Sequence, residues 1–298
     1  MAALNPSVNP LATLLGQGGT ALAPMRAERL ARMAVEALVD EAMLTPKPGL
    51  VDMRGSGAHS DLTWLLMCGS AVALQPAFCR MAQAGHAIRD PQQLRHRIGA
   101  IGRDAEAAMM EATGGVNTHR GAIWALGLLV TAAARHAGAL DAAAIARAAG
   151  ALARIADTHA PATTGNKGEL ACREHGVGGA RGQARSGFPA VVDAALPMLR
   201  LSRARGDSEP QARVNALLAV MATLDDTCLL ARGGPHALRA TQAGARRVLA
   251  HGGIGTPNGR KALRALENRM RILHVSPGGA ADLLAASLLL DRIEHERW

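Results

Sequence analysis

Apolar residues recur at helical spacing along most of this chain. Between positions 25 and 44, apolar residues at 30, 33, 34, 37 and 38 fall on one helical face, and charged residues at 29, 32, 36 and 40 fall on the other. Similar periodicity predicts further helices at about 61–74, 91–112, 119–137, 141–159, 188–204, 209–224, 235–250, 257–273 and 279–294. No segment alternates apolar and polar residues for long enough to predict a strand. The pattern predicts an all-α fold with glycine-rich loops between the helices.

Proline and capping residues indicate where several helices end or begin. The segment Thr45-Pro46-Lys47-Pro48-Gly49 ends the first helix, because proline lacks a backbone N–H and pushes the preceding residue out of the helical region. Asp61 is predicted to cap the second helix, and Pro76 to end it. Asp90 is predicted to cap the third helix. A long polar loop therefore separates the first two helices.

The composition favours one large helical domain. Hydrophobic residues make up 49% of the 298 residues, and neither a fixed-period repeat nor a Ser/Pro-rich linker divides the chain. We predict a single all-α domain over 25–298, preceded by a loosely ordered N-terminal extension over 1–24. The longest apolar run, 122–134, is shorter than the roughly 20 residues that span a bilayer, and no basic residue precedes Arg26. We expect a cytoplasmic protein with no membrane partner.

The charge balance points to phosphate as a partner. Lys and Arg number 33 against 24 Asp and Glu, which gives a net charge of +9 at pH 7. The chain has no Tyr, two Phe and three Trp, whereas proteins that bind single-stranded nucleic acid stack the bases on aromatic side chains. A nucleic-acid partner is therefore not expected. A phosphorylated small molecule fits the charge better.

Charged residues gather beside glycines in five loops between the predicted helices. Glycines leave backbone N–H groups free to bind anions at helix N-termini, and arginine binds phosphate through two nitrogens. The alternative is that each glycine only reverses the chain and each Asp, Asn or Thr only caps a helix. The candidate substrate-binding residues are Lys47, Asp52, Arg54, His59, Asn117, Thr118, His119, Arg120, Gly121, Arg181, Arg185, Arg232, Gly233, Ser276, Gly278 and Gly279.

Several common enzyme motifs are missing from the sequence. There is no G-x-x-x-x-G-K-[ST], no H-E-x-x-H, no G-x-S-x-G, and no G-x-G-x-x-G after a strand. A P-loop NTPase, a zincin, an α/β-hydrolase and a Rossmann enzyme are therefore not expected.

The five loops resemble those of the triphosphoribosyl-dephospho-CoA synthase family. The matching blocks are TPKPGLVD at 45–52, GAHSD at 57–61, GVNTHRG at 115–121, RG at 181–182 with GFP at 187–189, DT at 226–227 with RGG at 232–234, and SPGGAADLL at 276–284. They run in order over about residues 28–290. Gln183, Cys228 and Thr63 depart from the residues expected at their positions in the family. The stretch RGSGAHSD at 54–61 favours the malonate decarboxylase branch of the family.

The resemblance implies a transferase that uses ATP without breaking its phosphate bonds. The ribose 2′-hydroxyl of 3′-dephospho-CoA attacks the anomeric carbon of the ATP ribose, and adenine leaves. The product, 2′-(5″-triphosphoribosyl)-3′-dephospho-CoA, is the prosthetic-group precursor for malonate decarboxylase or citrate lyase. A downstream transferase and an acyl carrier protein are then the expected protein partners, and a homodimer is a further expectation.

Such a glycosyl transfer needs a base for the hydroxyl and an acid for the leaving adenine. Asp61 and Asp226, with Glu111, are the candidate catalytic residues. Mg²⁺ is expected with ATP, and its candidate ligands are Asp61, Asp225, Asp226 and Asp282. A cap or a helix-dipole role remains the alternative for Asp61 and Asp282.

Two other classes stay open at this point. An all-α, metal-dependent hydrolase of ADP-ribosyl bonds would use water in place of the hydroxyl acceptor. A helical nucleic-acid or carrier-protein binding module would release no adenine.

Overall fold

The computed structural model describes the backbone of residues 10–136 and 141–296, and the side chains from Pro24 onward within these ranges. The described residues form thirteen α-helices and one π-helical segment, and they contain no strand. The elements are α1 Pro10–Met43, α2 Trp64–Ala73, α3 Gln75–Ala87, α4 Pro91–Ala112, α5 Arg120–Arg135, α6 Ala142–Arg154, α7 Lys167–His175, α8 Gly179–Arg185, η1 Ala190–Ala195, α9 Leu196–Ala204, α10 Glu209–Met221, α11 Thr227–Ala250, α12 Pro257–Leu273 and α13 Gly278–His295. The predicted all-α fold is confirmed.

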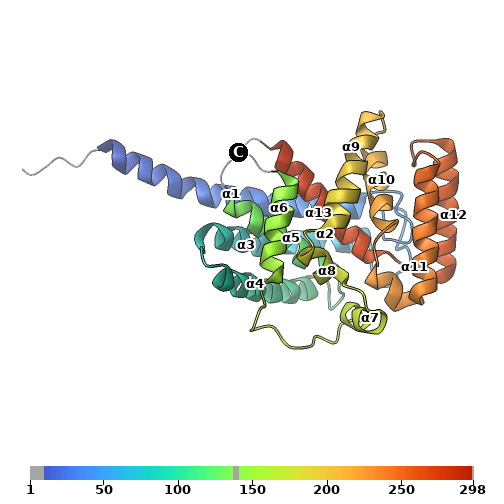
Figure 1. The fold of residues 1–298 in the computed structure, drawn as a ribbon, viewed down its shortest axis with the longest axis horizontal. Coiled ribbons are helices and arrows are strands. Elements are labelled where there is room, and N and C mark those ends of the chain that lie inside the picture. Colours follow the sequence, from blue (N-terminus) through green and yellow to red (C-terminus); the bar gives the residue numbers. More distant parts are fainter. Residues whose placement is uncertain (1–9, 137–140, 297–298) are drawn as a thin grey trace, which may run out of the picture.

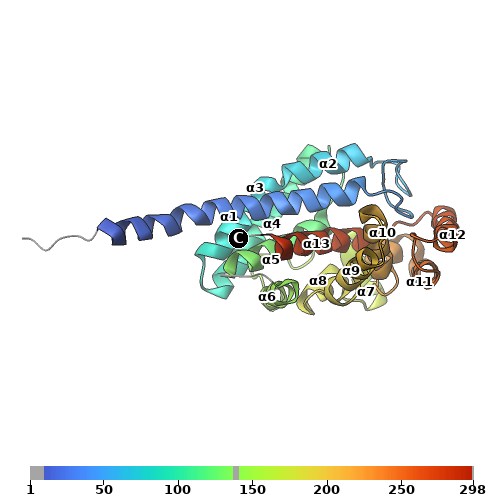
Figure 2. The same ribbon diagram turned by 90° about the horizontal axis from the view of Figure 1, so that it is seen from above.

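The Ala-rich helix α5 forms the centre of the fold. Every residue from Ala122 to Ala134 except Trp124 is buried, as expected of a helix that is apolar around its whole circumference. Helices α1, α3, α4, α6 and α13 pack around it. Figure 2 shows α1 running the length of the molecule with α13 beside it, and Figure 1 shows α11 and α12 paired at one end.

Only part of the predicted N-terminal extension, 1–24, falls within the described residues. Residues 1–9 of the predicted extension lie outside them, and residues 10–24 belong to α1. The first helix thus begins at Pro10 and not near Met25. Whether the segment before residue 25 is loosely ordered stays a prediction.

The second predicted helix, 61–74, corresponds to α2, and α3 lies in a stretch where no helix is predicted. Helix α2 begins at Trp64 with Thr63 as its cap, whose Oγ1 accepts from Leu66 N at 3.2 Å, so the predicted cap at Asp61 is wrong. Leu74 separates α2 from α3. Pro76 does not stop a helix: it lies in the first turn of α3, where proline is tolerated because that N–H has no helical partner.

Other boundaries also differ from the predicted ones. Helices α7 and α8 lie in a stretch where no helix is predicted. Helix α11 begins at Thr227, before the predicted start at 235, and contains a kink at Gly234, where φ is 61° and ψ is −167°. The predicted cap of α4 is confirmed, since Asp90 Oδ1 accepts from Gln93 N at 2.7 Å.

One stretch, 64–87, is long and apolar enough to cross a membrane by length and composition alone. It covers α2 and α3 and is interrupted at Leu74, and α3 packs against α1 and α5. Core helices of globular proteins meet the same criterion, so this stretch is weak support for a membrane span.

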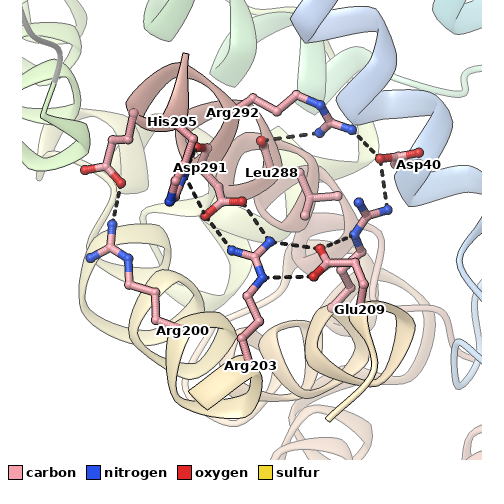
Figure 3. Close-up of polar contacts among 10 residues, drawn as sticks. Asp40, Arg200, Arg203, Glu209, Leu288, Asp291, Arg292 and His295 are labelled. Atoms are coloured by element: carbon pink, nitrogen blue, oxygen red, sulfur yellow. Dashed lines mark hydrogen bonds and ion pairs between the residues drawn. The ribbon is translucent and has the colours of Figure 1, made fainter. Parts of the chain in front are cut away.

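A network of ion pairs joins α1, α9, α10 and α13 at the C-terminal end of α13 (Figure 3). Arg203 donates to both oxygens of Glu209 at 2.8 and 2.9 Å and to both oxygens of Asp291 at 2.8 Å. Arg213 pairs with Glu209 at 2.8 Å and with Asp40 at 2.9 Å. Arg292 pairs with the same Asp40. The network fixes the C-terminal end of α13.

Candidate active site

Asp52 organises the loop between α1 and α2. Its carboxylate accepts from Lys47 N at 2.9 Å and from Arg54 N at 2.8 Å, and the residue is 2% exposed. The backbone closes a tight turn, with hydrogen bonds of 3.0 and 3.1 Å between Asp52 and Gly55. The structure therefore gives Asp52, a predicted substrate-binding residue, a role in shaping the loop.

The same loop buries the side chain of Lys47 against the end of α1. Lys47 Nζ donates to Glu41 Oε1 at 2.6 Å and to the Glu41 carbonyl at 2.5 Å. The two side chains are 2% and 3% exposed. A buried charge of this kind needs its partner, because water no longer solvates it.

A cavity of about 220 Å³ opens beside this loop. Its lining includes Lys47, Gly57 and, from α12, Glu267 and Arg271. Arg54 also lines it and donates to Asp52 at 2.7 Å and to Glu267 at 2.5 Å. These two carboxylates raise the pKa of Arg54, with the hydrogen bond to Asp52 as the main cause. The charge of Arg54 is thus already balanced by the protein.

Asp226 joins the starts of α11 and α13. Its Oδ1 accepts from Cys228 N at 2.8 Å and from Leu229 N at 3.4 Å, as expected of an N-cap. Its Oδ2 accepts from Ala280 N of α13 at 2.9 Å. Burial raises the pKa of Asp226, and these backbone donors oppose that rise. A Cβ on Gly279 would lie 3.2 Å from this carboxylate, so glycine permits the close approach.

Asp282 joins the starts of α13 and α5. Its carboxylate accepts a hydrogen bond from the backbone of Ala122, and a Cβ on Gly121 would lie 2.1 Å from Oδ2. Burial raises the pKa of Asp282 well above its ordinary value, and the carboxylates of Glu41 and Asp226 raise it further. The N-termini of three helices, α5, α11 and α13, therefore meet beside a group of acidic side chains.

His119 is a buried histidine near Lys47. Its Nδ1 lies 3.0 Å from Ser70 Oγ, which is 2.6 Å from Thr118 Oγ1. Burial and the charge of Lys47 lower the pKa of His119 to about 4. Its Nε2 is buried and has no hydrogen-bond partner within the described part of the chain, as is also true of Ser276 Oγ. The described protein therefore leaves both polar atoms without a hydrogen bond.

His59 and Arg232 lie next to each other. Arg232 donates to His59 Nδ1 at 3.2 Å and to the Ala58 carbonyl at 3.4 Å. Burial and this guanidinium lower the pKa of His59, and Asp61 opposes the effect. The Asp61 carboxylate is 3.8 Å from His59 Nδ1 and 61% exposed. Two predicted residues, His59 and Asp61, are thus adjacent, but Asp61 faces solvent.

Other predicted residues lie away from the buried carboxylates. Glu111 and Asp225 are exposed. Arg120 Nε donates to Glu106 on α4 at 2.9 Å, so a carboxylate of the protein balances this first-turn cation. Asn117 Oδ1 accepts from Arg120 N at 3.2 Å. Arg181 and Arg185 lie on α8 and are exposed.

Gly233 and Gly278 lie where neighbouring side chains leave little room for a Cβ atom. A Cβ on Gly233 would lie 2.6 Å from the Cβ of Ala237, and one on Gly278 would lie 3.0 Å from Cys228 Sγ. The Cys228 thiol is itself unsuited to nucleophilic chemistry, because burial, followed by the charges of Asp226 and Asp282, raises its pKa far above the ordinary value.

The residues that depart from the family pattern have structural roles here. Gln183 Oε1 accepts from Ala190 N at 3.2 Å, which joins the end of α8 to η1. Thr63 caps α2. Cys228 supplies a backbone N–H to Asp226.

Two site residues carry no signal that sequence reasoning could use. Glu41 lies in a regular helical pattern, and Ser70 in an apolar helix. Each becomes a site residue only because Lys47 or His119 packs against it.

Comparisons with known proteins place the chain in a family. Residues 27–298 match the CitG family, described as ATP:dephospho-CoA triphosphoribosyl transferase. The chain belongs to this family. The resemblance and the enzyme class predicted from the loops are confirmed. Four of the blocks that carry the resemblance to this transferase family supply Lys47, His119, Asp226 and Asp282.

Several curated members of the transferase family are similar over nearly their whole length. A protein of Stutzerimonas stutzeri strain A1501, named probable 2-(5″-triphosphoribosyl)-3′-dephosphocoenzyme-A synthase, is 57% identical over 91% of this chain and 93% of the relative. A Klebsiella pneumoniae protein with the same name, without the word probable, is 53% identical over 91% of this chain and 98% of the relative. No solved structure matches the chain.

Proposed function

We propose that this chain transfers the triphosphoribosyl group of ATP to the ribose 2′-hydroxyl of 3′-dephospho-CoA. Adenine is released, and 2′-(5″-triphosphoribosyl)-3′-dephospho-CoA is formed. The observation that carries the proposal is the meeting of Lys47, His119, Asp226 and Asp282 at one place, from four separate blocks of the family resemblance. The names of the Stutzerimonas and Klebsiella relatives support the same reaction.

Asp226 and Asp282 are the proposed base and acid. Burial raises the pKa of Asp226, but backbone N–H groups reach both its oxygens and favour the ionised form. Asp282 lies half-buried near Glu41 and Asp226, and its desolvation and their charges favour its protonated form. Two carboxyl groups whose pKa values are separated by their surroundings suit opposite roles. Asp61 and Glu111, both exposed, are less suited to this chemistry.

The proposed step is a single displacement at the anomeric carbon of the ATP ribose. Asp226 takes the proton from the 2′-hydroxyl as the new C–O bond forms, and Asp282 gives a proton to adenine as the C–N bond breaks. Positive charge develops on the ribose during this step, and ionised carboxylates nearby stabilise it. His119 Nε2, neutral and buried, is placed to accept a hydrogen bond from a substrate hydroxyl.

The triphosphate is held without being cleaved. Arg232, in the second turn of α11, offers a guanidinium to the phosphates, whereas Asp226 and Asp282 already accept from backbone N–H groups at the starts of α5, α11 and α13. This arrangement agrees with the missing P-loop, because the phosphate bonds need no activation.

Mg²⁺ is expected to enter with ATP. Magnesium in nucleotide enzymes binds to one or two carboxylates together with water and phosphate oxygens. Of the four predicted ligands, Asp61 fits best, because its carboxylate is exposed and lies 3.8 Å from His59 Nδ1. The carboxylate of Asp226, in contrast, already accepts hydrogen bonds from backbone N–H groups. When bound, the ion would neutralise phosphate charge.

The product would serve malonate decarboxylase, the branch that RGSGAHSD at 54–61 favours, with citrate lyase as the second candidate. A downstream transferase would carry it to the acyl carrier protein in the cytoplasm. Purified synthase product offered to the two downstream transferases in parallel separates these branches, since only the matching one modifies its carrier protein.

The reaction is tested by incubating the chain with ATP, Mg²⁺ and 3′-dephospho-CoA and measuring free adenine by chromatography. Adenine release that requires dephospho-CoA supports transfer, and release without it indicates a hydrolase. Asp226→Asn and Asp282→Asn are each expected to slow release about 100-fold or more. Asp225→Asn, at the exposed neighbouring carboxylate, is the control and is expected to keep wild-type activity. Full activity of both test variants contradicts the assigned roles.

A further inference from the structure

Arg95 on α4 is a buried arginine whose hydrogen-bond donors are largely unused. The residue is 7% exposed, and its Nε and NH1 have no hydrogen-bond partner among the residues that the structure describes. Its guanidinium lies over the ring of Trp124, with Cζ 5.1 Å from the ring centroid. Trp124 Nε1 is likewise buried and lacks a partner in the described chain. Three donor atoms on two stacked side chains thus need an acceptor.

The surroundings of Arg95 are strongly positive. Asp157 Oδ2 lies 3.6 Å from Arg95 NH1 and accepts from Arg103 NH1 at 2.9 Å. Burial lowers the pKa of Arg95, Asp157 opposes this, and Arg103, Arg181 and Arg185 lower it further. Among the described groups that act on Arg95, one carboxylate therefore faces three additional guanidinium groups. Such an excess attracts an anion.

This cluster lies beside the active centre. Trp124 follows Gly121 by three residues on α5, so the two share one side of the helix. Helix α8, which carries Arg181, packs against α5, and a Cβ on its first residue, Gly179, would lie 3.2 Å from Thr227 next to Asp226. Figure 1 shows α4, α5 and α8 in the same region of the fold. The carboxylates and the arginines thus lie on helices that pack against α5 or against one another.

We propose that Arg95 and Trp124, together with Arg181, form a phosphate-binding subsite for one of the two nucleotide substrates. The inference rests on the proposed function, which supplies two linked-phosphate groups: the triphosphate of ATP and the diphosphate of dephospho-CoA. Phosphate oxygens accept several hydrogen bonds at once, and the planar guanidinium of arginine matches that geometry. The unused donors at Nε and NH1 of Arg95 and Nε1 of Trp124 are thereby satisfied.

A metal ion is a poorer occupant of this region. His96, Asp157 and His159 have potential ligand atoms within 4.8 Å of one another. However, Arg103 already donates to Asp157, and Arg95 lies 3.6 Å from the same oxygen. Two guanidinium charges beside the carboxylate repel a cation, whereas they favour a phosphate.

Kinetics distinguish the two phosphate sources. Arg95→Lys keeps the charge but removes the planar set of donors, and Arg97→Lys makes the same change at an exposed arginine two residues along α4. We expect Arg95→Lys to raise the KM of one substrate roughly 10- to 100-fold, with a much smaller change in kcat. A rise for ATP assigns the subsite to the triphosphate, and a rise for dephospho-CoA assigns it to the diphosphate. Unchanged KM values for both substrates overturn the subsite.

Trp124→Phe tests the same subsite with a smaller change. It keeps an aromatic ring beneath Arg95 and removes only the Nε1 donor. We expect a several-fold rise in the KM of the same substrate that Arg95→Lys affects. This variant decides the matter if circular dichroism shows that Arg95→Lys does not fold.

A binding measurement separates failure of the subsite from failure of the proposed reaction. In a Trp64→Phe/Trp298→Phe protein, Trp124 is the sole tryptophan, so its fluorescence reports on the subsite. Inorganic tripolyphosphate is expected to change this fluorescence saturably, and the change is expected to disappear with Arg95→Lys but to remain with Arg97→Lys. If no adenine is released, the proposed reaction fails while this titration still decides the subsite. No saturable change at millimolar tripolyphosphate overturns it.

Discussion

The carboxylate of Asp282 lies against the backbone of Gly121, where a Cβ would be 2.1 Å from Oδ2. This contact joins the N-terminal part of α13 to the first turn of α5, and Asp226 similarly joins α13 to α11. The two aspartates therefore satisfy backbone donors at helix starts and supply the acidic groups of the site. Structure and chemistry depend on the same atoms.

Gly121→Ala is expected to reduce adenine release about 100-fold, because the added methyl displaces the Asp282 carboxylate and small misplacements at a reacting centre are costly. The measurement is the rate of adenine release at saturating substrates. Gly69→Ala on α2 is the matched control, since a Cβ there meets nothing within 4 Å. Equal activity of Gly121→Ala and the wild type contradicts the assigned position of Asp282.

Lys47→Met is expected to lower the free energy of unfolding by about 3–5 kcal/mol, because it leaves the buried Glu41 carboxylate without its partner. Urea denaturation followed by circular dichroism measures the change. Lys261→Met, at an exposed lysine of α12, is the control and is expected to be close to neutral. An unchanged urea midpoint for Lys47→Met shows that the pair does not contribute in this way.

His119 is expected to make the protein less stable as pH falls. Its pKa is about 4 in the folded chain, against an ordinary value of 6.5, so between these values the unfolded state binds a proton that the native state does not. Stability is therefore lost as pH falls from 6.5 to 4, by up to roughly 3 kcal/mol.

The contribution of His119 can be isolated with His119→Gln. This variant is expected to lose less stability than the wild type between pH 7 and about pH 4.5, as measured by urea midpoints. His251→Gln, at an exposed histidine, is expected to follow the wild type. Parallel curves for His119→Gln and the wild type contradict a neutral, buried His119.

The ion-pair network in Figure 3 gives the stability a second pH dependence, at lower pH than that of His119. The hydrogen bond from Arg203, with that from Arg213, lowers the pKa of Glu209 from 4.5 to about 2. The stability that Glu209 contributes is present above pH 4.5 and is lost as pH falls toward 2. Because Glu209 is partly exposed, we expect Glu209→Gln to cost only about 1 kcal/mol at pH 7.

The melting temperature measures this effect. The difference between the wild type and Glu209→Gln is expected to be largest at pH 7 and to vanish near pH 2. Glu174→Gln, at a carboxylate that is 75% exposed, is expected to show no difference at either pH. A difference that persists at pH 2 contradicts the role of the ionised Glu209.

Local signals predicted most of the helices but not all their ends. Periodicity identified α4, α5, α6, α9, α10, α12 and α13, because the apolar stripe of a helix depends only on near neighbours. The prediction that Pro76 ends a helix is wrong, because proline breaks a helix interior but is tolerated in a first turn. Asp61 and Thr63 both offer a capping oxygen, and only the path of the loop decides that Thr63 caps α2.

The sequence by itself determined the family, the helical class and the loops that carry the chemistry, because these depend on residue type and short spacing. Only the tertiary structure decided that Glu41 faces Lys47, that Asp61 faces solvent, and that Asp282 meets Gly121. It also placed Arg95 on Trp124, two residues without any shared motif. The reason is physical: helix formation and capping depend on near neighbours, whereas contacts between distant segments depend on how the helices pack.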